Sequence, residues 1–256
     1  MDLVRRHQKS LGLYLRFSNN KNVRIRFDRD IVFLKHISYN HLKSTDGNMV
    51  DELPRSVYWL DNTLYLNITN QCSNSCYFCL KRYKRGVGGF NLKLTHEPTA
   101  EEIIIELAKV LFVRNWDGLV FCGFGEPTER LDVLFEVTRW VKQNYRRPLQ
   151  IRVDTNGHGY ILNYGRDVAF ELKVTGVEKV SVSLNAGDKE TYLDICKPMF
   201  PDAYEAVLDF VRRAKLLLDV EVTVVRLPEV DLVKVQAVAD SLGVAFKVRE
   251  YIPCFY

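Results

Sequence analysis

The chain has 256 residues, of which 47% are hydrophobic and 27% are charged, an ordinary composition for a globular protein. It contains no apolar run of about 18 residues and opens without the apolar core of a signal peptide, so we expect neither a transmembrane helix nor secretion. Six cysteines, three of them in one octapeptide, favour a reducing compartment, and we expect a cytoplasmic protein.

Residues 1–56 are predicted to form a small, mostly β appendage. Apolar residues alternate or cluster in 11–17, 22–27 and 31–34, and polar breakers separate these stretches, which predicts two or three strands. Residues 1–60 hold 11 Lys and Arg against 6 Asp and Glu, and therefore carry the whole basic excess of a chain whose net charge is +4. This excess fits contact with nucleic acid or another polyanion, and it equally fits a solvated basic face.

Residues 57–256 are predicted to form an α/β domain, because strand-like runs alternate there with longer helical patterns. A helix opens near Pro98, where Thr99 and Glu102 form a potential capping box, and Gly243 is the expected end of the last helix. Six such alternations predict a parallel sheet with crossover helices, whereas eight would close a full barrel. The predicted strands are 64–69, 118–123, 149–154, 179–184, 220–225 and 244–248, and the predicted later helices begin near Leu131 and cover 168–174, 203–218 and 230–242.

Three cysteines, Cys72, Cys76 and Cys79, follow the first predicted strand directly, and no fourth cysteine is near them in the sequence. Iron–sulfur clusters are usually held by four thiolates, so a three-cysteine site leaves one iron without a protein ligand. An open position distinguishes a catalytic metal site from a structural one. A structural zinc site needs four ligands, and His96 alone does not complete such a set, although a zinc-stabilised binding module remains an alternative.

Polar residues and glycines follow the later strands, at the sheet edge where α/β folds bind their ligands. Glycines let backbone approach a ligand closely, and Ser183 and Asn185 alternate with Leu184 and so point to one side. Asn156 is either a ligand-binding residue or part of an Asx turn with Gly157. The candidates are Gly123, Gly125, Glu126 and Pro127 after the second strand, Asp154, Asn156 and His158 after the third, Ser183 and Asn185 after the fourth, and Arg249 after the last.

Two further features of the sequence are not assigned to a single function. Cys196, after the fourth strand, is a candidate substrate-side thiol, while Cys254 carries no prediction. Residues 81–90 combine four cations with a glycine-rich stretch, which fits either a mobile, anion-binding lid or a solvated loop.

Taken together, the CxxxCxxC spacing after a strand and the sequence Gly123-Phe124-Gly125-Glu126-Pro127 resemble the radical S-adenosylmethionine (radical SAM) superfamily, although Phe124 separates the two glycines of that family's GGEP motif. The resemblance implies a partial (β/α)6 TIM-like barrel beside the N-terminal appendage. Over about residues 57–252 the chain is similar to the TatD-associated radical SAM group, on the segments Asn67-Ile68-Thr69-Asn70, 86–89, 97–102, 121–130, 183–186 and Cys196-Lys197-Pro198.

This resemblance also implies cofactors and roles. Cys72, Cys76 and Cys79 would bind three irons of a [4Fe–4S] cluster, and SAM would chelate the fourth. Reductive cleavage of SAM would give a 5′-deoxyadenosyl radical that abstracts hydrogen from a small molecule, nucleotide or peptide, or alternatively from an RNA or DNA component. A flavodoxin or ferredoxin would supply the electron, and a TatD-type nuclease is a possible partner. The SAM-binding residues would be Phe78, Gly123, Gly125, Glu126, Pro127, Asn156, Ser183 and Asn185, and Asp154, His158 and Cys196 are candidates for catalysis.

Overall fold

A computed structural model describes residues 14–18, 22–27, 30–35 and 53–252 of the chain. The chain divides into two compact units, Met1–Lys43 and Ser44–Tyr256. Among the described residues, no helix is both long and apolar enough to cross a membrane. Cys254 lies outside the described residues.

The first unit contains a three-stranded antiparallel sheet in the order β1-β2-β3. Its strands are β1 (Tyr14–Ser18), β2 (Asn22–Phe27) and β3 (Asp30–Lys35), so the prediction of strands here is confirmed. Short polar connections separate them, as the breaker residues indicated.

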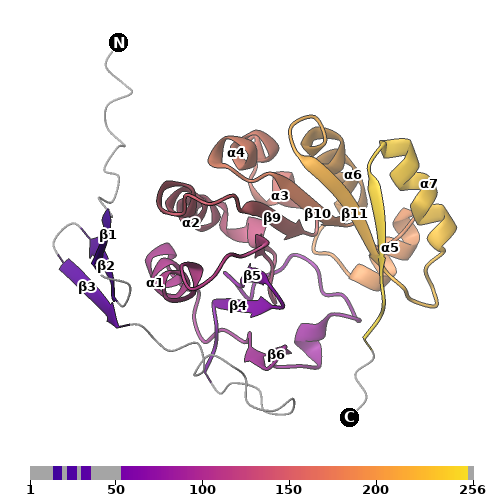
Figure 1. The fold of residues 1–256 in the computed structure, drawn as a ribbon. Helices are drawn as coiled ribbons and strands as arrows, with labels where there is room; N and C mark the ends of the chain where they lie inside the picture. The colour runs from indigo at the N-terminus through magenta and orange to yellow at the C-terminus, as the bar shows by residue number, and fades with distance from the viewer. Residues whose placement is uncertain (1–13, 19–21, 28–29, 36–52, 253–256) are drawn as a thin grey trace. The chain divides into compact units, whose positions relative to one another are not determined.

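The second unit is built on a seven-stranded sheet in the order β12-β11-β10-β9-β8-β5-β4 (Figure 1). Six of these strands, β5, β8, β9, β10, β11 and β12, are parallel, which confirms the six predicted strands and the partial barrel. The edge strand β4 is antiparallel to β5 and was not predicted. The strands are β4 (Val57–Leu60), β5 (Thr63–Leu66), β8 (Gly118–Phe121), β9 (Gln150–Thr155), β10 (Lys179–Ser183), β11 (Asp219–Val225) and β12 (Ala245–Arg249).

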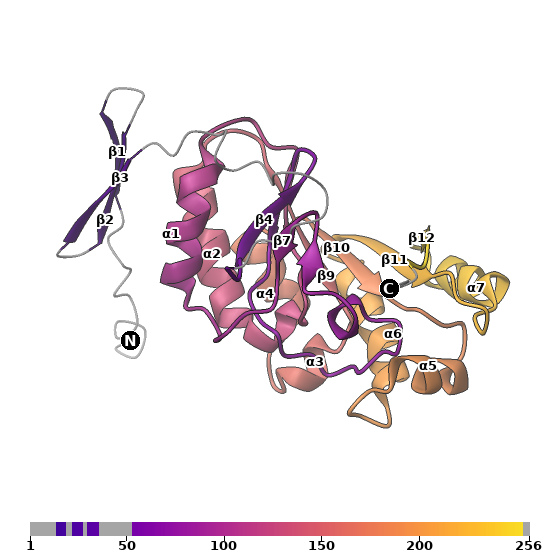
Figure 2. The same ribbon diagram turned by 90° about the horizontal axis from the view of Figure 1, so that it is seen from below.

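Helices follow the parallel strands and lie along the outer side of the curved sheet, as the two views show (Figures 1 and 2). The capping box of Thr99 and Glu102 is present at α1, and Gly243 ends α7 with a left-handed φ of 64°. The helix predicted over 203–218 ends at Ala214, and α5 was not predicted. The helices are α1 (Ala100–Leu111), α2 (Leu131–Asn144), α3 (Gly159–Leu162), α4 (Val168–Thr175), α5 (Lys189–Cys196), α6 (Ala203–Ala214) and α7 (Leu232–Leu242), with 3-10 turns η3 (Leu80–Arg82) and η4 (Pro127–Arg130) and a small hairpin of β6 (Gly86–Val87) and β7 (Phe90–Asn91).

The two faces of the large sheet differ in chemistry because side chains alternate along each strand. The face toward the helices is apolar and fully buried, as at Leu66, Phe121 and Val182. The register between strands places polar and charged residues together on the opposite, inner face. The inner-face residues include Tyr65, Arg152, Asp154, Lys179, Ser181, Ser183, Glu221, Thr223, Lys247 and Arg249.

Candidate metal and cofactor site

The three predicted metal ligands lie on one loop, residues 67–79, which leaves β5 at the carboxyl edge of the sheet and is called the Cys loop below. Cys72, Cys76 and Cys79 are partly buried free thiols. Burial, the Glu126 carboxylate and the other two thiols raise the pKa of Cys72 to about 12. Thiols in such surroundings ionise only when positive charge is bound among them, as a metal provides.

Within the described residues, no group of three or more His, Cys, Asp and Glu side chains is arranged to hold a single metal ion. In an iron–sulfur cluster each thiolate binds a different iron, so a cluster does not require the thiols to converge on one ion.

The end of α5 and the segment after it are hydrogen-bonded to the Cys loop. The amide N–H of Ser75 donates to the Cys196 carbonyl at 2.9 Å, and the Met199 N–H donates to the Ser73 carbonyl at 2.9 Å. The Cys196 thiol is fully buried and contacts the Cys76 thiol, and this contact together with burial raises the pKa of Cys76. Cys196, predicted as a substrate-side thiol, therefore lies beside the predicted metal ligands.

A buried polar network joins the end of β9 to the Cys loop. Nδ1 of His158 lies 2.9 Å from Oγ of Ser73, and Nε2 lies 3.0 Å from the Tyr192 hydroxyl. The Asn156 amide donates to the same Ser73 oxygen at 2.9 Å, and the Asn74 amide donates to the Tyr192 hydroxyl at 3.2 Å. His158, a candidate acid or base, thus lies under the loop with no exposed surface. Ser73 and Tyr192 had no sequence signal that singled them out.

This network makes a prediction about stability and pH. Burial lowers the pKa of His158 to about 4, so the folded protein holds the ring neutral, whereas the unfolded chain protonates it near pH 6.5. The stability that His158 contributes is therefore complete above pH 6.5 and is lost as the pH falls toward 4. The free energy of unfolding of wild type relative to His158→Gln should fall by up to ~3 kcal/mol over this range, at about 1.36 kcal/mol per pKa unit. Urea denaturation at both ends of the range measures it, and a difference independent of pH contradicts the assignment.

The Gly-Phe-Gly-Glu-Pro turn after β8 is packed against the start of the Cys loop. A Cβ atom on Gly125 would lie 2.4 Å from the carbonyl oxygen of Thr69 and 2.5 Å from that of Gln71, so only glycine fits. The neighbouring N–H of Glu126 donates to the Gln71 carbonyl at 2.7 Å. The turn and the Cys loop are consequently positioned as one unit.

The buried Glu126 carboxylate joins the ends of β8 and β9. It accepts hydrogen bonds from Thr128, from the Thr155 hydroxyl at 2.7 Å and from the Asn156 N–H at 2.6 Å. Burial raises its pKa, which these donors partly offset. Pro127 is buried and begins η4.

The remaining predicted SAM-binding residues surround the same edge. Asn156 is buried, and its amide also lies 3.9 Å from the Cys72 sulfur. Asn185 has a left-handed φ of 58°, and its buried Oδ1 has no hydrogen-bond partner among the described residues, which leaves an acceptor for a ligand. Ser183 accepts from Arg249 at 3.2 Å, and Phe78 is partly buried in the Cys loop.

Asp154 lies on the inner face, below these strand ends. Arg152 forms an ion pair with it at 2.8 Å, yet burial raises the pKa of Asp154 above its usual value. Arg249 and Cys122 are close enough to lower the pKa of this carboxyl. The structure therefore brings Asp154, Ser183 and Arg249 to one face, and it separates them from His158 and Cys196.

Comparison with known families agrees with this geometry: residues 66–242 match the sequence model of the family described as the radical SAM superfamily. The chain belongs to the radical SAM superfamily. Radical SAM enzymes use a [4Fe–4S] cluster and SAM, which are the cofactors that the Cys loop and its surroundings suit.

Among curated relatives of this radical SAM protein are probable GTP 3′,8-cyclases. That of Saccharolobus islandicus (strain L.S.2.15 / Lassen #1) is 32% identical over 168 residues, which is 65% of this chain and 46% of the relative. That of Thermococcus kodakarensis is 29% identical over 153 residues, or 59% and 43% of the two chains. The chain thus spans less than half the length of these curated relatives.

Solved radical SAM structures share the fold. HydG, a maturase of the [FeFe]-hydrogenase, has a TM-score of 0.56 at 18% identity, covering 75% of this chain and 43% of HydG. Streptococcus suis SuiB bound to SAM has a TM-score of 0.53 at 14% identity, covering 74% and 40%. Methylornithine synthase (PylB) has a TM-score of 0.52 at 17% identity, covering 75% and 53%. At these identities the likeness concerns architecture alone.

Proposed function

We propose that Cys72, Cys76 and Cys79 hold a [4Fe–4S] cluster with one iron open to SAM, and that the enzyme removes hydrogen from an anionic substrate on the inner face of the barrel. The observation that carries this proposal is the single unit formed by the Cys loop and the Gly125 turn, which brings three thiols to the carboxyl edge of the sheet. When bound, the cluster and SAM together supply a 5′-deoxyadenosyl radical.

The protein's own residues bind and orient SAM in this proposal. The turn containing Gly123, Gly125 and Glu126 would bind the SAM amino group through its backbone. Asn185, whose buried Oδ1 has no hydrogen-bond partner among the described residues, and Ser183 would bind the ribose and carboxylate. The backbone at Phe78 would contact the adenine, and Asn156 holds the loop beside Cys72. A dry, pre-shaped site of this kind limits side reactions of a radical.

The inner face provides the substrate's charge partners. Arg249 is exposed there, and within the described part of the chain no carboxylate lies within ion-pair distance of its guanidinium. A guanidinium binds carboxylate or phosphate in a planar, two-pronged geometry. Asp154 lies on the same inner face, close enough to Arg249 for the guanidinium to lower its pKa, and in this proposal it accepts a hydrogen bond from a donor on the same substrate. Because curated relatives are named GTP 3′,8-cyclases, GTP is the first compound to test.

Substituting Arg249 tests this substrate site. Removing one charged hydrogen-bonding partner typically costs about 1.5–3 kcal/mol, so Arg249→Gln should raise the Kd for GTP by about tenfold or more. Lys247→Gln is the matched control, because Lys247 is an exposed cation on the same edge strand and face. Calorimetry on the SAM-loaded protein measures both values. Equal affinity in wild type and Arg249→Gln, or no GTP binding at all, removes this substrate assignment without affecting the cluster.

The metal content tests the proposal itself. Anaerobically reconstituted protein should contain iron and acid-labile sulfide in equal amounts and give the electron paramagnetic resonance signal of a reduced [4Fe–4S] cluster. Zinc without sulfide would instead support the alternative of a metal-stabilised binding module.

The other expectations remain predictions. These are membership of the TatD-associated group, a TatD-type nuclease as partner, a nucleic-acid substrate and a cytoplasmic location. Salt-dependent RNA binding that disappears on deletion of residues 1–56 would favour the nucleic-acid alternative, since neutralised phosphates make binding sensitive to salt.

A further inference from the structure

The sequence around the Cys loop has an unusual charge pattern. Residues 62–96 contain no Asp or Glu but five Lys and Arg. Four of these cations, Lys81, Arg82, Lys84 and Arg85, come directly after Cys79 and are exposed. Among the residues that the structure describes, none of the four has a carboxylate within ion-pair distance. No ion pair within the described residues therefore neutralises these four cations, although the Glu229 carboxylate accepts a hydrogen bond from Tyr77 of the Cys loop at 2.9 Å.

Hydrogen bonds hold this basic segment against the Cys loop. The Arg82 guanidinium donates to the Cys76 carbonyl at 2.9 Å and to the Ser75 carbonyl at 3.0 Å, and Lys81 donates to the Asn70 carbonyl at 2.5 Å. The Tyr83 hydroxyl donates to the Tyr77 carbonyl at 2.6 Å. Residues 81–83, part of the stretch 81–90 that fitted either a mobile, anion-binding lid or a solvated loop, are consequently attached to the loop that carries the three thiols.

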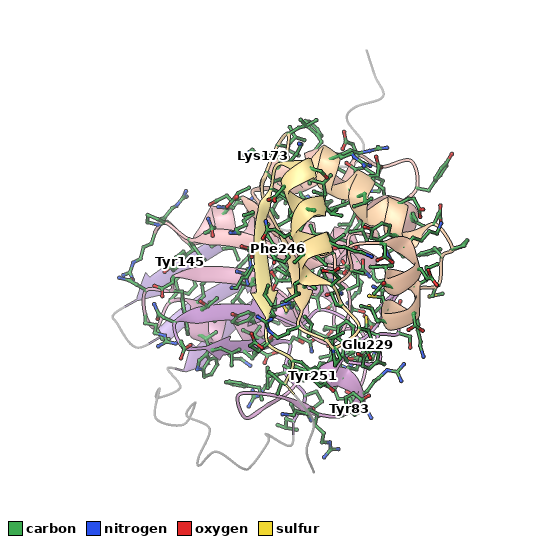
Figure 3. All side chains as sticks on the ribbon, turned by 90° about the vertical axis from the view of Figure 1, so that its right-hand side faces the viewer. Tyr83, Tyr145, Lys173, Glu229, Phe246 and Tyr251 are labelled. Carbon is green, nitrogen blue, oxygen red and sulfur yellow. The ribbon has the colours of Figure 1, made fainter. Side chains whose placement is uncertain are left out.

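The same segment presents a surface suited to a protein partner. Tyr83 is 49% exposed and lies at the rim of the molecule in Figure 3. Arg82 and Lys84 flank it in the sequence. Lys84 and Arg85 extend the basic surface beyond it. Exposed tyrosine and arginine are enriched at protein interfaces, and clustered charge of one sign steers partners of the other sign.

We propose that residues 81–85 are the docking surface for a small acidic one-electron donor protein, an inference that rests on the cluster proposed above. Electron transfer slows steeply with distance, so the donor must contact the surface next to the Cys loop, and residues 81–85 contribute four exposed cations to that surface. In the step itself one electron leaves the reduced donor and enters the oxidised cluster; no bond forms or breaks. A nucleic acid also suits a basic surface, but it has no reason to dock beside the thiols.

The test compares two double variants of the holoenzyme that change charge equally. Lys84→Glu with Arg85→Glu alters the proposed surface and keeps the anchoring Arg82. Arg139→Glu with Lys173→Glu is the control: both residues are exposed on outer helices, and Lys173 lies at the opposite end of the molecule from Tyr83 in Figure 3. Calorimetry measures the binding of oxidised flavodoxin, which serves as the acidic probe. Stopped-flow absorbance measures the rate of cluster reduction, first by photoreduced flavodoxin and then by reduced methyl viologen, a small cation.

In the Lys84/Arg85 variant we expect flavodoxin to bind at least about tenfold more weakly and to reduce the cluster at least about tenfold more slowly at low salt. Both the affinity and the rate should depend less on salt than in wild type. Methyl viologen should reduce it as fast as wild type, and the control variant should resemble wild type with both reductants. Unchanged flavodoxin binding, an equal loss in the control, or binding of single-stranded RNA that depends on these residues while flavodoxin binding does not would each overturn the proposal. A wild-type protein that methyl viologen cannot reduce would instead contradict the proposed cluster.

Discussion

Gly125→Ala is expected to abolish stable loading with an iron–sulfur cluster. The new methyl group would lie 2.4 Å from the Thr69 carbonyl oxygen and 2.5 Å from that of Gln71, which are backbone atoms without a flexible side chain to move. The Gly125 turn and the Cys loop would have to separate, and the geometry of the thiols would change with them. Overpacking of this kind typically destabilises a protein by about 1–3 kcal/mol, so most of the fold should survive.

Gly118→Ala is the matched control for this substitution. Gly118 begins β8, the strand that leads into the same turn, but its nearest neighbour to a new Cβ is the Gln150 carbonyl at 3.5 Å, an ordinary contact. Iron and sulfide per chain, measured after reconstitution, should be close to wild type in Gly118→Ala and very low in Gly125→Ala. Full loading of Gly125→Ala would mean that the turn does not position the Cys loop.

The second prediction separates two thiols that touch. Cys76→Ala should lose the cluster, because it removes one of the three proposed ligands. Cys196→Ala should keep it, although Cys196 contacts Cys76 and removal of a buried thiol costs some stability. Iron and sulfide content and the electron paramagnetic resonance signal distinguish the two variants.

An equal loss of cluster in both variants would have a specific meaning. Cys196 would then be a fourth ligand, the cluster would have no open iron, and SAM could not bind to it as proposed. Retention in Cys196→Ala and loss in Cys76→Ala supports a three-cysteine site.

Local patterns were enough to predict most elements of the larger unit. The capping box at Thr99, the left-handed end of α7 at Gly243 and the six parallel strands all follow from short-range signals. Strand β4 was missed because its four residues, Val57–Leu60, form a short hydrophobic run without polar alternation. Asp61, with a positive φ of 52°, lies in the tight turn between this strand and β5. Helix α5 is only weakly amphipathic and so gave little periodic signal.

The site was predictable as a set of positions at strand ends but not as a set of contacts. Cysteine spacing and glycines are visible in the sequence, because chemistry fixes which residue types they must be. The pairing of Ser73 with His158, or of Cys196 with Cys76, arises from residues far apart in the chain. Tertiary packing alone decides that His158 is a buried hydrogen-bonding residue under the Cys loop.

The most direct test of radical SAM chemistry in this protein is formation of 5′-deoxyadenosine. Anaerobically reconstituted wild type and Cys76→Ala would be reduced with dithionite in the presence of SAM, and the nucleoside would be measured by mass spectrometry. We predict 5′-deoxyadenosine from wild type and none from the variant. A wild-type protein with an intact, reduced cluster that forms none, with or without GTP, would contradict the proposed cleavage of SAM at this site.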